Sequence, residues 1–320
     1  MEGKIPVTIL TGYLGSGKTT LLNRLLADTH GRKLAVIINE IGSVNIDGKL
    51  VMNVEEGMME LTNGCLCCTV REDLVQSLRQ LAQAREAGDV QFEALVIETT
   101  GLANPGGIIQ TFFAVPDVQA AYTIDGVVTV VDGYHLDKHI EKGAEAEEQI
   151  AYADVVLLNK ADLLTGKQQQ ELAAYIQRLN PTAEVIPTIQ ANLDTGRLLQ
   201  LQTLLTKDRL EARGLGGASH LSGVTSFVIR EERPLDLQMV YELMGAIVQE
   251  LGDYLYRYKG ILYIAELEKR VVFQGVHSMF AAAYDREWRE GEVRASELVF
   301  IGQGISKEWF AEHLRQCAAE

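Results

Sequence analysis

The residues with the most recognisable chemistry lie near the N-terminus. Residues 12–19 read GYLGSGKT and match the pattern GxxxxGK(S/T) of a phosphate-binding loop, directly after an apolar run and directly before a helical pattern. Glycines let the backbone N–H groups of such a loop turn towards phosphate, where a Cβ would obstruct the path. Lys18 can neutralise the β and γ phosphates, and the Thr19 hydroxyl can bind Mg²⁺. The nucleotide-binding residues expected in this loop are Gly12, Gly15, Ser16, Gly17, Lys18, Thr19 and Thr20.

A second group of candidates lies at the end of the strand-like run 94–98 and just beyond it. The sequence LVIETTG (95–101) ends its apolar part in Glu98, and Gly101 comes three residues later. An acidic residue at the tip of a strand beside the phosphate loop lies opposite Mg²⁺, and a glycine beyond it can donate its N–H to the γ-phosphate. We therefore predict Lys18 and Glu98 as catalytic residues and Gly101 as a nucleotide contact.

The sequence NKAD (159–162) follows the strand-like run DVVLL and is expected to recognise the base of the nucleotide. Asp162 can accept two hydrogen bonds from guanine, whereas adenine offers no such pair of donors. A buried carboxylate that adenine leaves unpaired would be costly, so this arrangement predicts a preference for GTP over ATP. Asn159 and Lys160 are expected to brace the loop and cover the base.

Three of the four cysteines lie within the sequence NGCLCC (63–68), and the fourth, Cys317, lies near the C-terminus. In an extended segment Cys65 and Cys67 project to the same side. Together with Cys68 they suit a soft or borderline cation such as Zn²⁺, Cu⁺ or Co²⁺. Three local thiolates leave one coordination position exchangeable, which suits a site that passes metal on rather than one that locks a fold. A thiol redox switch and cysteines that merely pack are the alternatives.

The sequence NEIGSVNID (39–47) follows the second strand-like run, where a first switch segment is expected. Glu40 could complete the metal site. Asp47 could orient the attacking water or contact Mg²⁺, and we include it among the catalytic candidates. From the spacing alone, a solvated acidic loop is an equally good interpretation.

Histidines give weaker signals. His135 and His139 are four residues apart in a helical pattern and could form a secondary metal site, but such residues more commonly form a solvated helix face. His277 lies in a strand pattern, where a packing role is expected.

The elements that must position these residues follow an alternating pattern. Up to about residue 205, short apolar β-branched runs alternate with helical segments, which predicts a mostly parallel sheet covered by helices on both faces. A charged stretch rich in Gly and Ser follows, and after it the order changes to strand, helix, several strands and a final helix. We expect an α/β P-loop NTPase domain at 1–207, a linker at 208–223 and a smaller α+β domain at 224–320.

The composition limits the classes of molecule that the protein is expected to bind. The 320 residues are 47% hydrophobic and carry a formal charge of −15, which disfavours nucleic acid and anionic lipid as partners. We find no apolar run of the length that a signal peptide or a membrane span needs. The clustered cysteines differ from a secreted disulfide framework, and a cytoplasmic location is expected.

In this order, GYLGSGKT, NEIG, NGCLCC, LVIETTG and NKAD resemble the CobW-like family of P-loop GTPases. VTSFVIR (224–230), RYKG (257–260) and LVFIG (298–302) are similar to that family's C-terminal domain. The resemblance implies a GTPase that uses GTP and Mg²⁺, binds Zn²⁺ or Co²⁺ through Cys65, Cys67 and Cys68, and delivers the metal to a client apo-metalloprotein. Ser43 replaces an acid common in the family, and the linker has only His220 where many members are His-rich.

Two other functions remain open at this point. A regulatory GTPase could use the cysteine cluster as a redox sensor, and a non-catalytic module could use GTP only to present a surface. Related GTPases pair when they bind GTP, so a nucleotide-dependent homodimer is also expected.

Overall fold

The computed structural model describes residues 3–27, 32–39, 50–52, 70–199, 201, 219–221 and 223–319. The chain divides into two compact units, residues 1–174 with 183–204, and residues 175–182 with 205–320. The division between a phosphate-loop domain and a linker at 207/208 remains a proposal. Among the residues described, no helix is long and apolar enough to cross a membrane.

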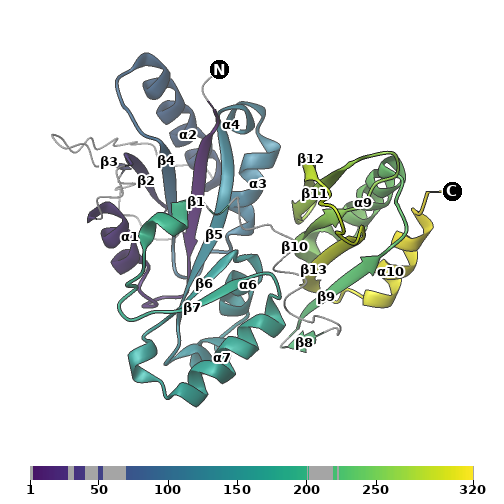
Figure 1. Cartoon of the computed structure of the whole chain (residues 1–320). Coiled ribbons are helices and arrows are strands. Elements are labelled where there is room, and N and C mark those ends of the chain that lie inside the picture. The colour runs from purple at the N-terminus through teal and green to yellow at the C-terminus, as the bar shows by residue number, and fades with distance from the viewer. Residues whose placement is uncertain are drawn as a thin grey trace. The chain divides into compact units, whose positions relative to one another are not determined.

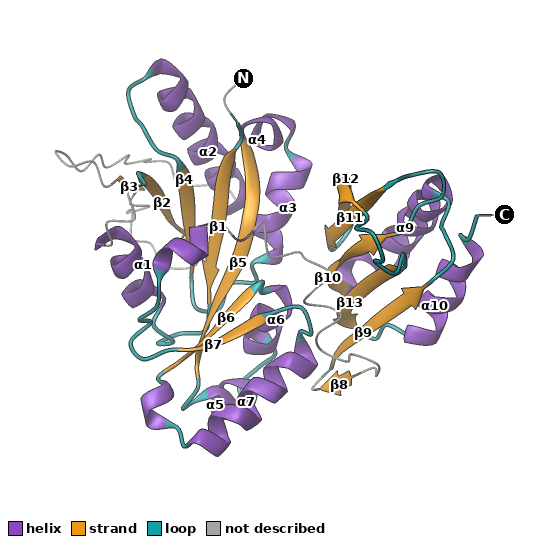
Figure 2. Ribbon diagram, in the orientation of Figure 1, coloured by secondary structure: helices purple, strands orange, loops and turns teal. Residues whose placement is uncertain are grey.

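The N-terminal unit alternates strands and helices (Figures 1 and 2). Its strands are β1 Ile5–Thr11, β2 Leu34–Asn39, β3 Leu50–Met52, β4 Ala94–Thr99, β5 Tyr122–Asp132, β6 Val155–Asn159 and β7 Glu184–Pro187. Its helices are α1 Lys18–Ala27, α2 Val70–Ala87, α3 Gly106–Ala114, α4 Pro116–Ala121, α5 Leu136–Ile140, α6 Glu145–Tyr152 and the first part of α7 Gly166–Leu179, with short 3₁₀ turns η1 Ala161–Leu163 and η2 Thr195–Leu199. From Tyr175 onward α7 belongs to the second unit.

The strands form one sheet in the order β3-β2-β4-β1-β5-β6-β7. All pairs are parallel except β2 with β3. The inner strands β4 and β6 are buried along their whole length, and β1 and β5 along most of theirs, because α1 and η2 share an apolar core with the sheet and α3, α4 and α6 contact β5. The predicted mostly parallel α/β sheet is confirmed.

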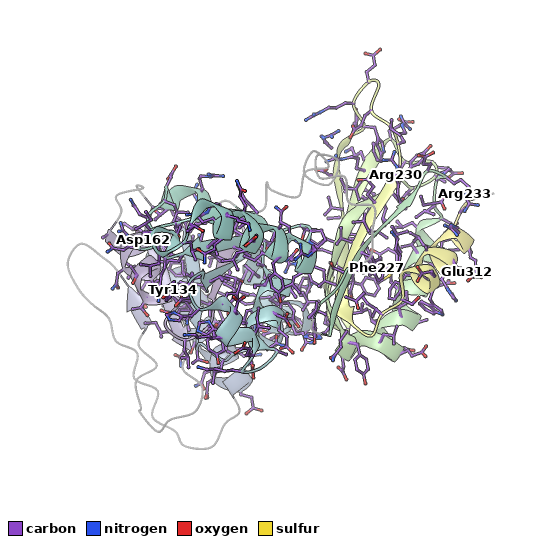
Figure 3. All side chains as sticks on the ribbon, turned by 90° about the horizontal axis from the view of Figure 1, so that it is seen from below. Tyr134, Asp162, Phe227, Arg230, Arg233 and Glu312 are labelled. Carbon is purple, nitrogen blue, oxygen red and sulfur yellow. The ribbon has the colours of Figure 1, made fainter. Side chains whose placement is uncertain are left out.

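The second unit is α+β. Its strands are β8 Ser219–Leu221, β9 Val224–Glu231, β10 Leu255–Leu262, β11 Lys269–Val276, β12 Met279–Glu287 and β13 Ser296–Gln303, and its helices are α9 Leu237–Leu251, the 3₁₀ turn η4 Gly252–Tyr254 and α10 Lys307–Gln316. They form a sheet in the order β12-β11-β10-β13-β9-β8, in which every pair is antiparallel. Residues of α9 and α10 share one apolar core with alternate residues of the strands. Figure 3 shows Phe227 inside this unit, whereas Arg233 and Glu312 lie on its outside.

Two details differ from the sequence prediction. Residues 219–221, which fall in the predicted linker, form β8 because Leu221 pairs with Val224 across a turn in which Gly223 has φ +94°. His277 does not lie in a strand. It occupies the turn between β11 and β12 with φ +51°, and its backbone N–H donates to the Leu255 carbonyl at 2.9 Å.

Candidate nucleotide site

The strand register brings the predicted site residues to one end of the parallel sheet. Leu10, at the end of β1, aligns with Glu98 of β4, and Asp132, at the end of β5, aligns with Asn159 of β6. The carboxyl ends of parallel strands form one edge, where α/β proteins bind ligands. The phosphate loop follows β1 directly, so it lies between Glu98 on one side and Asn159 on the other.

The backbone of the phosphate loop requires glycine at two places. Gly12 has φ +143°, and a Cβ there would lie 2.2 Å from the Val130 carbonyl oxygen of β5. Gly17 has φ +111°, and its Cβ would lie 2.4 Å from the side-chain nitrogen of Asn159. A side chain at either position would push the loop away from the strands that support it, which explains the glycines at positions 12 and 17.

Lys18 is the buried cation of the loop and is only 9% exposed. Its Nζ donates to the carbonyl oxygens of Gly12 at 2.8 Å and Tyr13 at 3.2 Å. Burial lowers the pKa of Lys18 below its ordinary value, and the charge of Glu98 offsets this only in part. An ammonium held by the loop's own carbonyls, in surroundings that penalise its charge, is suited to bind an incoming phosphate.

Thr19 and Glu98 lie together beside the phosphate loop. The Thr19 hydroxyl donates to Glu98 Oε1 at 3.2 Å, and Glu98 is buried at the tip of β4. A hydroxyl and a carboxylate beside a phosphate loop are the oxygen ligands that Mg²⁺ prefers. Ser16 Oγ is buried and has no hydrogen-bond partner among the described residues, so this hydroxyl could form a further hydrogen bond to a ligand. Thr20 follows in the exposed first turn of α1.

Asn159 connects the phosphate loop with the loop after β7. Its amide nitrogen donates to the Ser16 carbonyl at 2.8 Å, and its amide oxygen accepts from the Ala191 N–H at 2.9 Å and the Thr188 hydroxyl at 3.3 Å. Asn159 is 3% exposed, so these bonds are protected from water. One side chain thus fixes the phosphate loop relative to the segment that follows the NKAD motif.

Lys160 and Asp162 occupy the turn after β6. Lys160 has φ +59°, and its Nζ donates to Asp132 Oδ2 at 2.6 Å. Asp132 Oδ2 also bonds to His135 Nδ1 at 3.0 Å. Burial acts to raise the pKa of Asp132, but the hydrogen bonds from Lys160 and His135 outweigh it and leave that pKa below its ordinary value. Asp162 is exposed (Figure 3), so a base could reach it.

The interpretation of His135 and His139 as a solvated helix face is wrong for His139. His139 is 9% exposed and stacks on Tyr13 of the phosphate loop, with ring centroids 4.3 Å apart. Burial lowers the pKa of His139, and the charge of Asp132 opposes this. Across the described part of the chain, no group of three or more His, Cys, Asp or Glu residues could hold a metal ion.

Gly101 lies directly against the phosphate loop. A Cβ on Gly101 would be 2.5 Å from Leu14 Cδ2 and 2.7 Å from the Leu14 backbone nitrogen. The predicted γ-phosphate contact and the phosphate loop are therefore in van der Waals contact. The other predicted residues, which are Glu40, Asp47, Cys65, Cys67 and Cys68, lie outside the described residues.

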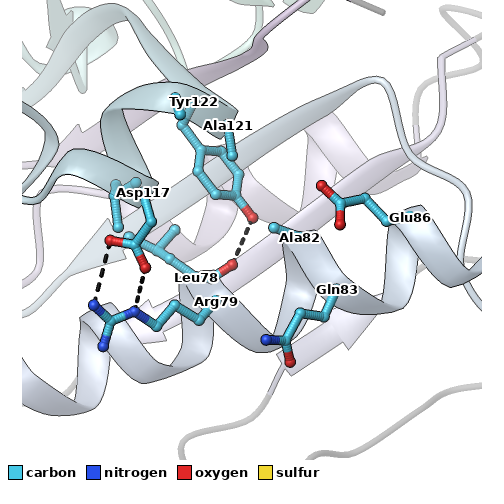
Figure 4. A pocket seen from close by; sticks show the side chains of 10 residues that line it. Leu78, Arg79, Ala82, Gln83, Glu86, Asp117, Ala121 and Tyr122 are labelled. Atoms are coloured by element: carbon cyan, nitrogen blue, oxygen red, sulfur yellow. Dashed lines mark hydrogen bonds and ion pairs between the residues drawn. The ribbon is translucent and has the colours of Figure 1, made fainter.

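A pocket of about 500 Å³ opens at the opposite end of the same sheet (Figure 4). Tyr122, the first residue of β5, lines it and donates its hydroxyl to the Leu78 carbonyl at 2.9 Å. Arg79 and Asp117 form an ion pair across its rim, and both side chains are about half exposed. Since Asp132 lies at the other end of β5, this pocket is separate from the nucleotide site.

Sequence reasoning assigned no role to three residues that contact the site, namely Tyr13, Asp132 and Gln149. Gln149 donates to the carbonyl oxygens of Gly101 and Ala103, both at 3.1 Å. A signal existed for Asp132, because GVVTVVD ends in an acid just as LVIE does. Nothing local in the sequence marks Gln149, which lies in the middle of a short helix.

Comparison with known proteins identifies the relatives. Residues 6–187 match the family model described as "CobW/HypB/UreG, nucleotide-binding domain", and residues 224–318 match "Cobalamin synthesis protein cobW C-terminal domain". The chain is 37% identical to the zinc chaperone YjiA of Escherichia coli, over 95% of this chain and 96% of that protein. It is 33% identical to the zinc chaperone CobW of Pseudomonas aeruginosa, over 99% and 92% of the two chains.

A solved structure agrees with these relatives. The Zn(II)-bound YjiA GTPase from E. coli superposes with a TM-score of 0.77 at 35% identity, over 99% of this chain and all of that one. The match includes both units, and the resemblance to CobW-like GTPases is confirmed. The chain belongs to the CobW/HypB/UreG family and carries its cobW-type C-terminal domain.

Proposed function

We propose that this protein hydrolyses GTP and uses the hydrolysis to bind Zn²⁺ or Co²⁺ through its Cys-x-Cys-Cys sequence and deliver it to a client metalloprotein. The observation that carries the proposal is the arrangement of Lys18, Thr19 and Glu98 around the phosphate loop, in a chain similar to proteins named zinc chaperones. The first two parts of the proposal, nucleotide chemistry and base selection, rest on the described residues.

The phosphate chemistry assigns one role to each residue. Lys18 exchanges its carbonyl partners for the β and γ phosphates, because a phosphate oxygen is a stronger acceptor for an ammonium than a peptide carbonyl. Thr19 and Glu98 would hold Mg²⁺, which when bound neutralises charge on the β and γ oxygens. Gly101, in contact with the phosphate loop, is placed to donate its N–H to the γ-phosphate.

Base selection assigns Asp162 to guanine. Asp162 lies in the turn that Asn159 and Lys160 fix, Asn159 through the phosphate loop and Lys160 through Asp132. A fixed carboxylate selects guanine over adenine, because only guanine presents two donors in the required positions. GTP is therefore the proposed substrate, and GDP the product that remains bound.

The metal part of the proposal rests on where the cysteine segment begins and ends. β2 ends at Asn39, which is aligned with Thr99 next to Glu98, and α2 begins at Val70. The residue that precedes Glu40 and the cysteine segment therefore lies beside the proposed Mg²⁺ ligands. A change there between the GTP and GDP states would alter the geometry that the thiolates offer to a metal.

The decisive experiment measures Zn²⁺ affinity by competition with a chelator in two nucleotide states. We expect Zn²⁺ to bind more tightly with non-hydrolysable GTP than with GDP, by about 1–3 kcal/mol of coupling free energy. Reciprocity requires Zn²⁺ to tighten GTP binding by the same factor. Affinity should fall as pH drops through the range in which thiols protonate, because protons compete for the ligands.

Three cysteine variants make the experiment specific. Cys65→Ala and Cys67→Ala should lose Zn²⁺ binding and keep nucleotide binding. Cys317→Ala is the matched control, because its thiol is buried in the C-terminal core and donates to the His313 carbonyl at 3.6 Å. Equal Zn²⁺ affinity in both nucleotide states would contradict the proposal. Reversible oxidation of Cys65 and Cys67 without Zn²⁺ binding would instead favour the redox-sensing GTPase.

A further inference from the structure

The loop between β4 and α3 is held from two sides. On one side Gly101 contacts Leu14 of the phosphate loop so closely that no side chain fits between them. On the other side Gln149 of α6 donates from one amide nitrogen to the carbonyl oxygens of Gly101 and Ala103, both at 3.1 Å. The loop that follows Glu98 is therefore fixed between the phosphate loop and α6.

Gln149 is built into the protein interior. It is 1% exposed, and its backbone carbonyl accepts a hydrogen bond from the Thr129 hydroxyl of β5 at 2.8 Å. Its side-chain oxygen is buried and has no hydrogen-bond partner in the described part of the chain. Burying an unpaired amide oxygen costs about 1–3 kcal/mol, so an apolar side chain would be the less costly choice for packing alone. The two bonds to the loop explain why an amide occupies this position.

The geometry of these bonds orients the loop. The peptide between Gly101 and Leu102 is trans, as are all peptide bonds that the structure describes, so its N–H points opposite to its carbonyl. Because Gln149 binds the Gly101 carbonyl, the Leu102 N–H is directed away from α6. The Gly101 N–H belongs to the preceding peptide, and it is held indirectly, because the carbonyl of the same residue is fixed and its Cα lies against Leu14. Fixing donors before the reaction avoids the cost of orienting them during it.

We infer that Gln149 is a positioning residue for GTP hydrolysis, which holds the loop carrying Gly101 in the orientation that the γ-phosphate requires. This inference rests on the proposed GTPase function. Gln149 acts through the loop and not by contact with the nucleotide. The neighbouring contact, Asn104 to Glu148 at 3.0 Å, is exposed to solvent and therefore contributes little to the orientation.

Loss of the Gln149 bonds should affect GDP binding differently from binding of the γ-phosphate and hydrolysis. GDP binding depends on the phosphate loop and the NKAD turn, neither of which Gln149 contacts in the bonds described above. Binding of the γ-phosphate and the hydrolytic step depend on the loop after Glu98. Loss of the Gln149 bonds should therefore leave GDP affinity unchanged, lower the preference for GTP over GDP and lower kcat.

The test compares Gln149→Met with Thr129→Val in the full-length protein. Methionine retains the length of glutamine without its donors. Valine removes the Thr129 bond to the Gln149 backbone and leaves the amide bonds to the loop, so it controls for a general loss of packing around α6. We expect kcat to fall about tenfold in Gln149→Met with unchanged GDP affinity, and to stay near the wild-type value in Thr129→Val.

The outcomes distinguish this inference from the function on which it rests. If wild-type protein hydrolyses GTP in a Lys18-dependent manner and Gln149→Met has the kcat of Thr129→Val, the inference alone is overturned. If wild-type protein shows no Lys18-dependent hydrolysis, the proposed function fails and the inference fails with it. Should Gln149→Met not fold, Gln149→Asn takes its place with the same expectation, because its amide is one methylene too short to reach both carbonyls.

Discussion

The two units each bury a long cationic side chain, and they do so differently. In the N-terminal unit, Lys18 donates to the Gly12 and Tyr13 carbonyls, and burial lowers its pKa. In the second unit, Arg270 of β11 is 2% exposed and pairs with two carboxylates, with Nε 3.0 Å from Asp285 Oδ2 and Nη1 3.4 Å from Glu292 Oε1.

The difference distinguishes a binding site from a structural ion pair. Arg270 has its counter-charges within the fold, so the fold itself compensates for its burial. Lys18 is held by neutral carbonyls, and the charge of Glu98 offsets its burial only in part, so a bound phosphate would supply the remaining counter-charge. A buried cation that bonds to carbonyls near a glycine-rich loop is therefore a better indicator of an anion site than burial alone.

The largest expected effect concerns Lys18. Lys18→Ala should lower GTP hydrolysis at least about a thousandfold, or roughly 4 kcal/mol of transition-state stabilisation, because it removes the charge that meets the γ-phosphate. Circular dichroism should show an unchanged fold, since the lysine faces a ligand rather than the apolar core. Phosphate release measured beside the wild type provides the comparison. A fully active variant would exclude the phosphate-loop assignment.

The second effect concerns Arg270. Arg270→Met should lower the free energy of unfolding of the protein by about 3 kcal/mol, because Asp285 would lose its buried partner and Glu292, which also pairs with Arg286, would lose part of its counter-charge. Urea denaturation measures this change. GTP affinity at a temperature where the variant is folded should not change, and a loss of affinity would show that the two buried cations are not independent.

The third effect concerns the pH dependence of stability through Glu292, which pairs with Arg270. The hydrogen bond from Arg286, with smaller contributions that include the charge of Arg270, lowers the pKa of Glu292 from 4.5 to about 2. A carboxyl whose folded pKa is lowered stabilises the protein above its unfolded pKa, and this contribution is lost as pH falls from about 4.5 to about 2. Glu292→Gln should reduce the pH dependence of unfolding in that range. An unchanged dependence would contradict the assignment.

The smallest effect concerns Asp162, whose carboxylate is exposed and meets its partner only when nucleotide binds. Asp162→Asn should weaken GTP binding about thirtyfold, or roughly 2 kcal/mol, and improve binding of xanthosine triphosphate, because xanthine presents a carbonyl where guanine has its amine. Unfolding should be unaffected without nucleotide. Isothermal titration with GTP, ATP and xanthosine triphosphate tests this, and equal wild-type affinity for ATP and GTP would contradict the base assignment.

Much of the fold could be predicted because its signals are local. Short apolar runs between helical patterns indicated the six parallel strands, and the change of pattern near residue 224 indicated the second sheet. The misassigned elements lacked such signals. β8 is only three residues long, and the turn at His277 contains neither glycine, asparagine nor proline to mark it.

The residues of the candidate site could be named from the sequence in part, and their binding roles stay predictions. The phosphate loop and the NKAD turn are continuous in sequence, so their residues could be named in advance. The contacts that connect them are not continuous. Lys160 donates a hydrogen bond to Asp132, which lies 28 residues away in the sequence, and Gln149 donates to Gly101, which lies 48 residues away. Such pairs depend on the strand order, which residue spacing does not reveal.

That strand order also has a consequence for synthesis of the protein. β1 carries the phosphate loop and lies between β4 and β5, so it gains both neighbours only after the chain has been made through Asp132. At ribosomal rates of about 5–20 residues per second, β1 waits on the order of ten seconds for its second partner. During that interval an apolar strand is available to wrong partners. Folding of this unit is therefore expected to depend on protection of its first strand on the ribosome.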